Sequence, residues 1–141
     1  MRSRSIYSAL LVASSALGCG GLDTVGNSNL LSGTYLATIF LVTPTGQAQS
    51  DVLAAGGSLS ITIDESGNTT GSLNIPGTVT GGAAFTASMA GTATVTGLTV
   101  EFNQAADSFV RDLTWARIGP DLSVANQVAG SASFTITLTH Q

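Results

Sequence analysis

Short apolar runs that alternate with polar residues constrain the fold of this chain more than any other feature. In the clearest run, Leu59, Ile61 and Ile63 alternate with serine and threonine. A period of two residues places apolar side chains on one face of a β-strand and polar ones on the other. The turn sequence at 65–68 leads directly into the next run at 69–75, so we expect these two runs to form a hairpin.

The same alternation continues to the end of the chain and gives nine candidate strands. Two of them, 93–95 and 98–102, would be one strand if the chain bends at Gly97, so we count about eight. The run at 34–43 is apolar on both faces, which predicts a strand curled through the middle of a closed structure. One helical turn is expected at 51–55, with Ser50 or Asp51 as its cap. The remaining candidate strands lie at 85–89, 113–115, 122–124 and 132–138.

Short strands with short connections predict an all-β fold, an antiparallel up-and-down meander. About eight such strands close into a small barrel that leaves no exposed edge, and a β-sandwich is the alternative. A membrane-spanning barrel is disfavoured because its strands need about ten residues and aromatic girdles. The chain has one Trp, two Tyr and five Phe. We expect a single barrel domain over residues 33–141.

The first 18 residues have the layout of a secretory signal. Arg2 and Arg4 precede an apolar stretch at 6–17, which is too short to span a bilayer, since a span takes about 20 residues. Without this signal the formal charge changes from −4 to −6, because two of the four arginines are lost. The chain has no lysine, so a nucleic-acid partner is excluded.

Residues 16–19, Ala-Leu-Gly-Cys, resemble the lipobox of bacterial lipoproteins, although Ala16 and Leu17 depart from the usual residues. The resemblance implies cleavage before Cys19 and lipidation of its sulfur. It also implies export to the cell envelope and the outer membrane, because Gly20 and not Asp follows Cys19. Residues 19–32 then form the lipidated N-terminus and a tether that reaches at most about 40 Å. The membrane is contacted through this lipid, since an acidic domain is repelled by anionic lipid heads.

The Gly33-Thr34-Tyr35 sequence at the start of the first strand, together with the meander and the lipobox, resembles lipocalin-like lipoproteins of the calycin group. In that family a tryptophan at the position of Tyr35 closes one end of the barrel under a basic side chain from the last strand. Here residues 131–139 contain no arginine. The resemblance implies a small apolar or amphipathic ligand in the barrel interior, where Ala87, Ala93 and Ala132 could leave space.

The residues of the chain do not assemble into a catalytic or metal-binding pattern. His140 is the one histidine and is expected to be solvated at a frayed end, and Cys19 is assigned to lipid. We therefore expect no enzyme activity, no metal and no cofactor. The carboxylates of Asp64 and Glu65, and of Asp107 and Asp112, are interpreted as turn-forming and solubilising groups.

The segment 109–117 contains both arginines of the mature chain and its tryptophan. If it is a strand, Arg111, Trp115 and Arg117 share a face. One interpretation is a binding mouth where Arg117 covers an aromatic ring and meets an anionic head group. The interpretation that we favour is a tryptophan packed at a barrel end, with both arginines paired to aspartates. Tyr35, Trp115 and Arg117 are the candidate ligand-binding residues.

Two functions stay open at this point. The first is a lipid-anchored lipoprotein of the cell envelope whose lipocalin-like barrel binds a small apolar or amphipathic molecule. The alternative is a non-enzymatic structural or protein-interaction module of the envelope with a filled core, whose protein partner is unknown.

Overall fold

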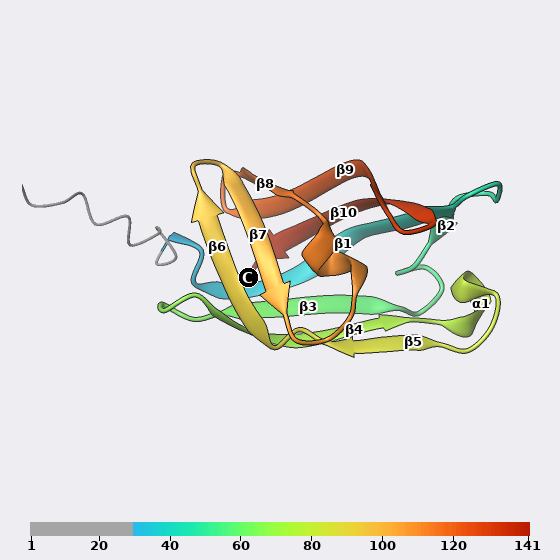
Figure 1. Ribbon diagram of the computed structural model, residues 1–141, viewed down its shortest axis with the longest axis horizontal. Coiled ribbons are helices and arrows are strands. Elements are labelled where there is room, and N and C mark those ends of the chain that lie inside the picture. The colour runs from blue at the N-terminus through green and yellow to red at the C-terminus, as the bar shows by residue number, and fades with distance from the viewer. Residues whose placement is uncertain (1–29) are drawn as a thin grey trace, which may run out of the picture.

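Ten β-strands run through residues 30–141, the part of the chain that the computed structural model describes. Eight of them close into an antiparallel barrel in the order β1-β3-β4-β6-β7-β8-β9-β10, and β10 pairs back onto β1 (Figure 1). The expected up-and-down barrel is confirmed, and the β-sandwich alternative is not formed. The predicted signal sequence at 1–18 and Cys19 lie outside the described residues.

The barrel strands are β1 (Gly33–Pro44), β3 (Ser58–Ile63), β4 (Asn68–Ile75), β6 (Gly91–Thr96), β7 (Thr99–Gln104), β8 (Trp115–Ile118), β9 (Asp121–Ala129) and β10 (Ala132–His140). The two additional strands are short: β2 (Ser50–Asp51) pairs with β1, and β5 (Phe85–Ser88) pairs with β4. Two four-residue helices complete the described chain, α1 (Gly77–Thr80) and η2 (Phe109–Asp112).

The barrel has two different ends, which the pairing of β1 with β10 defines. At one end Tyr35 lies opposite His140, and at the other Pro44 lies opposite Ala132. We call the first the closed end; the described chain begins there, and the β3–β4, β6–β7 and β8–β9 turns lie there (Figure 1). We call the second the open end; it contains the β9–β10 turn, α1 and the beginning of β5 (Figure 1).

The wall of the barrel divides at Gly71 in β4. The first residues of β4, Asn68 and Thr69, pair with β6, whereas residues 72–75 pair with β5. Gly71 has φ +130°, and its carbonyl oxygen accepts a hydrogen bond from Met89 N. Because β6 leaves β4 at this point, the open end is bordered by β5 instead of a continuous wall.

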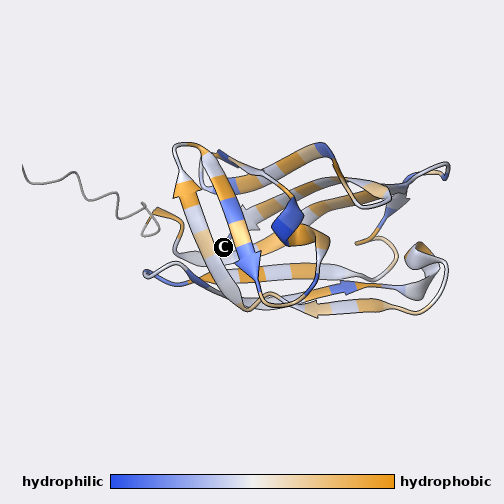
Figure 2. Cartoon of the chain, in the orientation of Figure 1, coloured by the Kyte–Doolittle hydropathy of each residue, from blue (hydrophilic) through white to orange (hydrophobic). Residues whose placement is uncertain are grey.

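The alternating pattern places apolar side chains inside the barrel, and Figure 2 shows the alternation along the strands. Trp115, Tyr35 and Phe40 are the largest fully buried side chains. Ala93 is buried, whereas Ala87 and Ala132 pack against the core while partly buried. The other buried apolar residues are Leu31, Val42, Val52, Leu59, Ile61, Ile63, Leu73, Ile75, Met89, Val100, Phe102, Val110, Leu113, Leu122, Val124, Phe134, Ile136 and Leu138.

The 58–63/68–75 hairpin forms as predicted, and so does the turn after β2. In that turn the Asp51 carboxylate accepts hydrogen bonds from the backbone N–H groups of Leu53 and Ala54. The α1 and η2 helices were not predicted, because four residues are too few to produce a helical period.

Three details of the predicted strands are wrong. Residues 93–95 and 98–102 belong to two strands, β6 and β7, joined by a tight turn at Gly97 and Leu98. The run at 85–89 forms a strand as predicted, β5, which lies beside the barrel wall, whereas the strand predicted at 113–115 begins only at Trp115, in β8. The apolar residues Leu36 and Ile39 of β1 are 41% and 44% exposed, so the second face of this strand is open to solvent and not buried in the middle of the fold.

Candidate binding site

A pocket of about 440 Å³ lies at the open end of the barrel. Its walls are Phe85 at the start of β5, the segment 107–112 before β8, and the β9–β10 turn at 129–132. The volume is within the range of about 300–1,000 Å³ that is usual for small-molecule sites. The site therefore lies where the divided barrel wall leaves the end uncovered.

Two phenylalanine rings form the floor of this pocket. Phe109 of η2 and Phe134 of β10 stack with their ring centroids 4.0 Å apart and their planes 8° from parallel. The Phe109 ring centroid also lies 6.1 Å from that of the fully buried Phe40. Phe109 consequently lies between the pocket and the apolar core, and Phe85, which is 36% exposed, adds a third ring at the rim.

A second hollow of about 300 Å³ adjoins the first and continues it across the open end. Both are lined by Ile75, Thr80, Ser131, Ala132 and Phe134. Val42, Gln47 and Val79 line only the second hollow. The surface available to a ligand is thus two adjoining hollows that share an apolar base of Ile75, Ala132 and Phe134.

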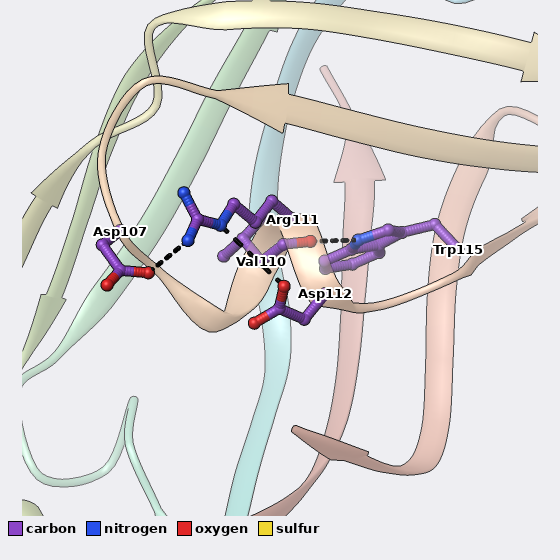
Figure 3. Close-up of polar contacts among 5 residues, drawn as sticks. All are labelled: Asp107, Val110, Arg111, Asp112 and Trp115. Atoms are coloured by element: carbon purple, nitrogen blue, oxygen red, sulfur yellow. Dashed lines mark hydrogen bonds and ion pairs between the residues drawn. The ribbon is translucent and has the colours of Figure 1, made fainter. Parts of the chain in front are cut away.

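The charged side chains that line the pocket are Asp107 and Asp112. Arg111 Nη2 donates a hydrogen bond to Asp107 Oδ1 at 2.5 Å, and Arg111 Nε lies 3.9 Å from Asp112 Oδ1 (Figure 3). All three side chains are exposed, and exposed pairs stabilise a fold by about 0–1 kcal/mol. The favoured interpretation is therefore confirmed for Arg111, and the rim of the pocket is acidic.

Trp115 is buried in the barrel and does not line the pocket. Its ring meets that of Phe102 edge to face, with the centroids 5.7 Å apart. The indole Nε1 donates a hydrogen bond to Val110 O at 3.3 Å (Figure 3). Because Val110 belongs to η2, Trp115 supports the short helix that carries Phe109 and thus positions the floor of the pocket.

Tyr35 and Arg117 lie at the closed end, far from the pocket. The Tyr35 hydroxyl donates a hydrogen bond to Leu31 O at 3.0 Å within the core. Burial raises the pKa of Tyr35; the positive charge of Arg117 lowers it and the negative charge of Asp121 raises it. Arg117 Nε donates to Gly119 O at 3.3 Å, not to an aspartate, so the expected pairing of this second arginine is wrong.

The expectation that His140 is a solvated residue at a frayed end is also wrong. It is the last residue of β10 and is half-buried, because its ring edge packs on Tyr35 with the centroids 5.1 Å apart. His140 N donates to Asp121 Oδ1 at 3.0 Å, and His140 Nε2 lies 3.2 Å from Ser32 O. The last strand therefore contributes a side chain that packs against Tyr35. This side chain is a histidine and not an arginine, which residues 131–139 lack.

A third hollow, of about 480 Å³, lies outside the barrel where η2 crosses β7. Its lining is mainly polar and includes Glu101, Asn103, Arg111 and Thr114.

The Asp64 carboxylate stabilises the β3–β4 turn, since it accepts hydrogen bonds from Ser66 N, Asn68 N and Asn68 Nδ2. This agrees with the predicted turn chemistry, and these hydrogen bonds, that of the Asn68 side chain first, lower the pKa of Asp64.

Within residues 30–141, no group of three or more His, Cys, Asp or Glu side chains is arranged to hold a metal ion. The helices of this part of the chain are too short to cross a bilayer. Comparison of the chain with protein-family models, with curated proteins and with solved structures found no match.

Proposed function

We propose that this chain is a non-enzymatic lipoprotein of the cell envelope, anchored in the outer membrane through Cys19, whose lipocalin-like barrel binds a small apolar or amphipathic molecule. The observation that carries the binding function is the pocket at the open end, with the stacked Phe109 and Phe134 rings as its floor. Aromatic rings provide large apolar contact areas at little entropic cost, and apolar pockets with few polar groups are typical of ligand sites.

The position of the pocket suits a protein held at its N-terminus. The pocket contains Ala132, where β10 begins, whereas the described chain enters the barrel beside His140, where β10 ends. The two are the first and last of the nine residues of β10, a distance of about 27 Å at the usual rise of a β-strand. A lipid at Cys19 would therefore be linked to the end of the barrel opposite the pocket, and a tether that reaches up to about 40 Å would leave the pocket accessible.

Titration with N-phenyl-1-naphthylamine, an uncharged apolar fluorophore, tests the binding function. We expect saturable fluorescence enhancement with the purified chain, and weaker binding to a Phe85→Ser variant because Phe85 lies at the pocket rim. Leu98→Ser is the matched control, since Leu98 is 72% exposed in the β6–β7 turn at the closed end. Absence of saturable binding, or an equal loss in both variants, would refute the proposal.

The anchor is tested separately by Cys19→Ala. We expect this variant to leave the membrane fraction or to accumulate as an uncleaved precursor, whereas Thr24→Ala in the tether fractionates like the unchanged chain. Unaltered membrane fractionation of Cys19→Ala would contradict lipidation.

The second candidate function is a structural or protein-interaction module of the envelope. It is favoured by the large side chains in the core, where Trp115, Tyr35 and Phe40 are fully buried. This function predicts that the fluorophore does not bind saturably and that the chain co-purifies with one partner in a fixed ratio. The two candidates are thus separated by the same titration.

A further inference from the structure

The charges around the pocket at the open end are unequal. Asp107 and Asp112 are the charged residues of its lining, and Arg111, which lies between them in the sequence, contacts both. Residues 30–141 contain seven acidic side chains and two arginines, and the second arginine, Arg117, belongs to β8 and lies at the closed end. The pocket therefore lies in a region of negative potential, with two carboxylates beside one guanidinium.

Arg111 leaves part of each carboxylate available to a ligand. Arg111 Nη2 donates a hydrogen bond to Asp107 Oδ1, whereas Arg111 Nε lies 3.9 Å from Asp112 Oδ1, beyond the range of a hydrogen bond (Figure 3). The Oδ2 atoms of these two carboxylates have no hydrogen-bond donor within residues 30–141. The side chains of Asp107 and Asp112 are 91% and 59% exposed. Both carboxylates therefore keep acceptor oxygens free at an accessible rim.

An aromatic surface lies beside these carboxylates. Phe109, which follows Asp107 by two residues and precedes Asp112 by three, stacks on Phe134 with the ring centroids 4.0 Å apart. Phe85 lines the same pocket and is 36% exposed. The faces of phenylalanine rings attract cations as well as apolar groups. The rings and the carboxylates consequently favour a ligand charge of the same sign.

The lining also contains a buried polar group without a partner. Ser108 lines the pocket and is 3% exposed, and its hydroxyl makes no hydrogen bond in the described part of the chain. A serine directly before a helix usually caps it, but Ser108 makes no capping bond to η2. Native folds pair nearly all buried polar groups, so an unpaired hydroxyl in a pocket lining points to a bound molecule or ion. This observation is independent of the charges and supports a ligand site at the same place.

We propose that the pocket selects amphipathic molecules with a cationic head, an organic ammonium group, over molecules with a neutral or an anionic head. The positive charge lies beside the Asp107 and Asp112 carboxylates at the rim, and the apolar chain lies on Phe85 and on the stacked rings. An anionic head would lose its hydration without gaining a free cationic partner, because Arg111 already contacts both aspartates. This inference rests on the proposed binding function and specifies its ligand class.

Displacement of N-phenyl-1-naphthylamine from the purified chain by three ten-carbon amphiphiles tests the head-group preference. The competitors are decyltrimethylammonium, decanol and decanoate, used at low ionic strength and below the concentrations at which they form micelles. We expect decyltrimethylammonium to bind at least about fivefold more tightly than decanoate, the gain from one favourable exposed ion pair, with decanol between the two. This preference should shrink at about 1 M salt, where charges are screened within about 3 Å.

Two variants change the charge at the rim in opposite directions. Asp112→Asn should reduce the preference for the cation over the anion by about threefold, and Arg111→Gln should increase it by about threefold. Both side chains are exposed, so we expect both variants to fold and to bind the uncharged fluorophore with unchanged affinity. Glu65→Gln is the matched control, because it removes one negative charge from the exposed β3–β4 turn at the closed end, and it should leave the head-group preference unchanged.

The outcomes separate this inference from the function on which it rests. If decanol or decanoate binds the unchanged chain as tightly as decyltrimethylammonium, or if Asp112→Asn keeps the preference that Glu65→Gln shows, the carboxylates do not select the head group. The inference is then overturned, while the proposed binding function stands. If the fluorophore does not bind the unchanged chain saturably, the proposed binding function fails, and the inference fails with it.

Discussion

Replacement of Tyr35 by phenylalanine is the most informative single change at the closed end. Tyr35 is fully buried, and its hydroxyl donates one hydrogen bond to Leu31 O at 3.0 Å. The Tyr35→Phe change keeps the ring and its edge contact with His140, but leaves the Leu31 carbonyl unpaired in the core. Loss of a buried hydrogen bond with an acceptor left behind costs about 1–2 kcal/mol. For a domain of this size the melting temperature should fall by about 4–10 °C.

The pH dependence gives a second, independent expectation. Burial raises the pKa of Tyr35 above 10.0, its ordinary value. A group whose pKa is higher in the folded state stabilises the fold fully below the unfolded pKa, and this contribution is lost as the pH rises through the folded pKa. The unchanged chain should therefore lose stability above about pH 10, whereas Tyr35→Phe has no ionisable group at this position. The difference in unfolding free energy between the two proteins should shrink in alkaline solution.

Urea unfolding followed by the fluorescence of Trp115, the one tryptophan of the chain, measures both effects. Thr34→Val is the matched control, because it removes an exposed hydroxyl contact with Thr62 in the neighbouring position and should cost less than about 0.5 kcal/mol. Equal stability of the unchanged chain and Tyr35→Phe at neutral pH, or a difference that stays constant at alkaline pH, would refute the reasoning. Fluorophore binding at the open end should be unaltered in Tyr35→Phe.

Two further substitutions test the division of the barrel wall and the first hairpin. Gly71→Ala should destabilise the fold by about 3 kcal/mol or more, because φ is +130° and an added Cβ would overlap the Ser60 carbonyl oxygen on β3. Gly46→Ala, at φ +75° with nothing near the added Cβ, should cost only about 1 kcal/mol, and equal urea midpoints for the two variants would disprove the steric argument. Asp64→Asn should flatten the loss of stability in acid: hydrogen bonds lower the pKa of Asp64 below 3.8, so its contribution is present above that pH and is lost as the pH falls through the folded pKa. Urea unfolding at about pH 5 and about pH 2.5 checks this, and parallel acid profiles of the two proteins would contradict it.

The fold class follows from the sequence because the barrel is built from local patterns. Alternation at 59–63 fixes which side chains point inward, and Asp64 and Gly67 supply the turn that brings β4 beside β3. The turn determines the register of the hairpin, and a register shift of one residue would expose the whole apolar face. The barrel repeats this local logic from one strand to the next, so its up-and-down order can be predicted, whereas the position of β5 beside the barrel depends on pairing that the local pattern does not contain.

The pocket could not be predicted in the same way, because it depends on contacts between distant segments. Phe85, Phe109 and Phe134 come from β5, η2 and β10, and their sequence spacing carries no period. The stack of Phe109 on Phe134 exists because η2 interrupts the segment that alternation alone would assign to a strand. A short helix of this kind is set by tertiary packing, here by the hydrogen bond from Trp115 to Val110 O, and not by local propensity.

The two ends of the barrel differ in their packing and hydrogen bonding, and this difference is the strongest reason to locate the function at the open end. At the closed end the Tyr35 hydroxyl donates a hydrogen bond to Leu31 O, and His140 N donates one to Asp121 Oδ1. At the open end the stacked rings of Phe109 and Phe134 border a pocket, and the Ser108 hydroxyl in its lining is buried without a partner. The closed end is thus packed and hydrogen-bonded, whereas the open end presents aromatic rings to a pocket. Apolar pockets of this kind are typical of small-molecule sites, and this contrast supports the proposed binding function.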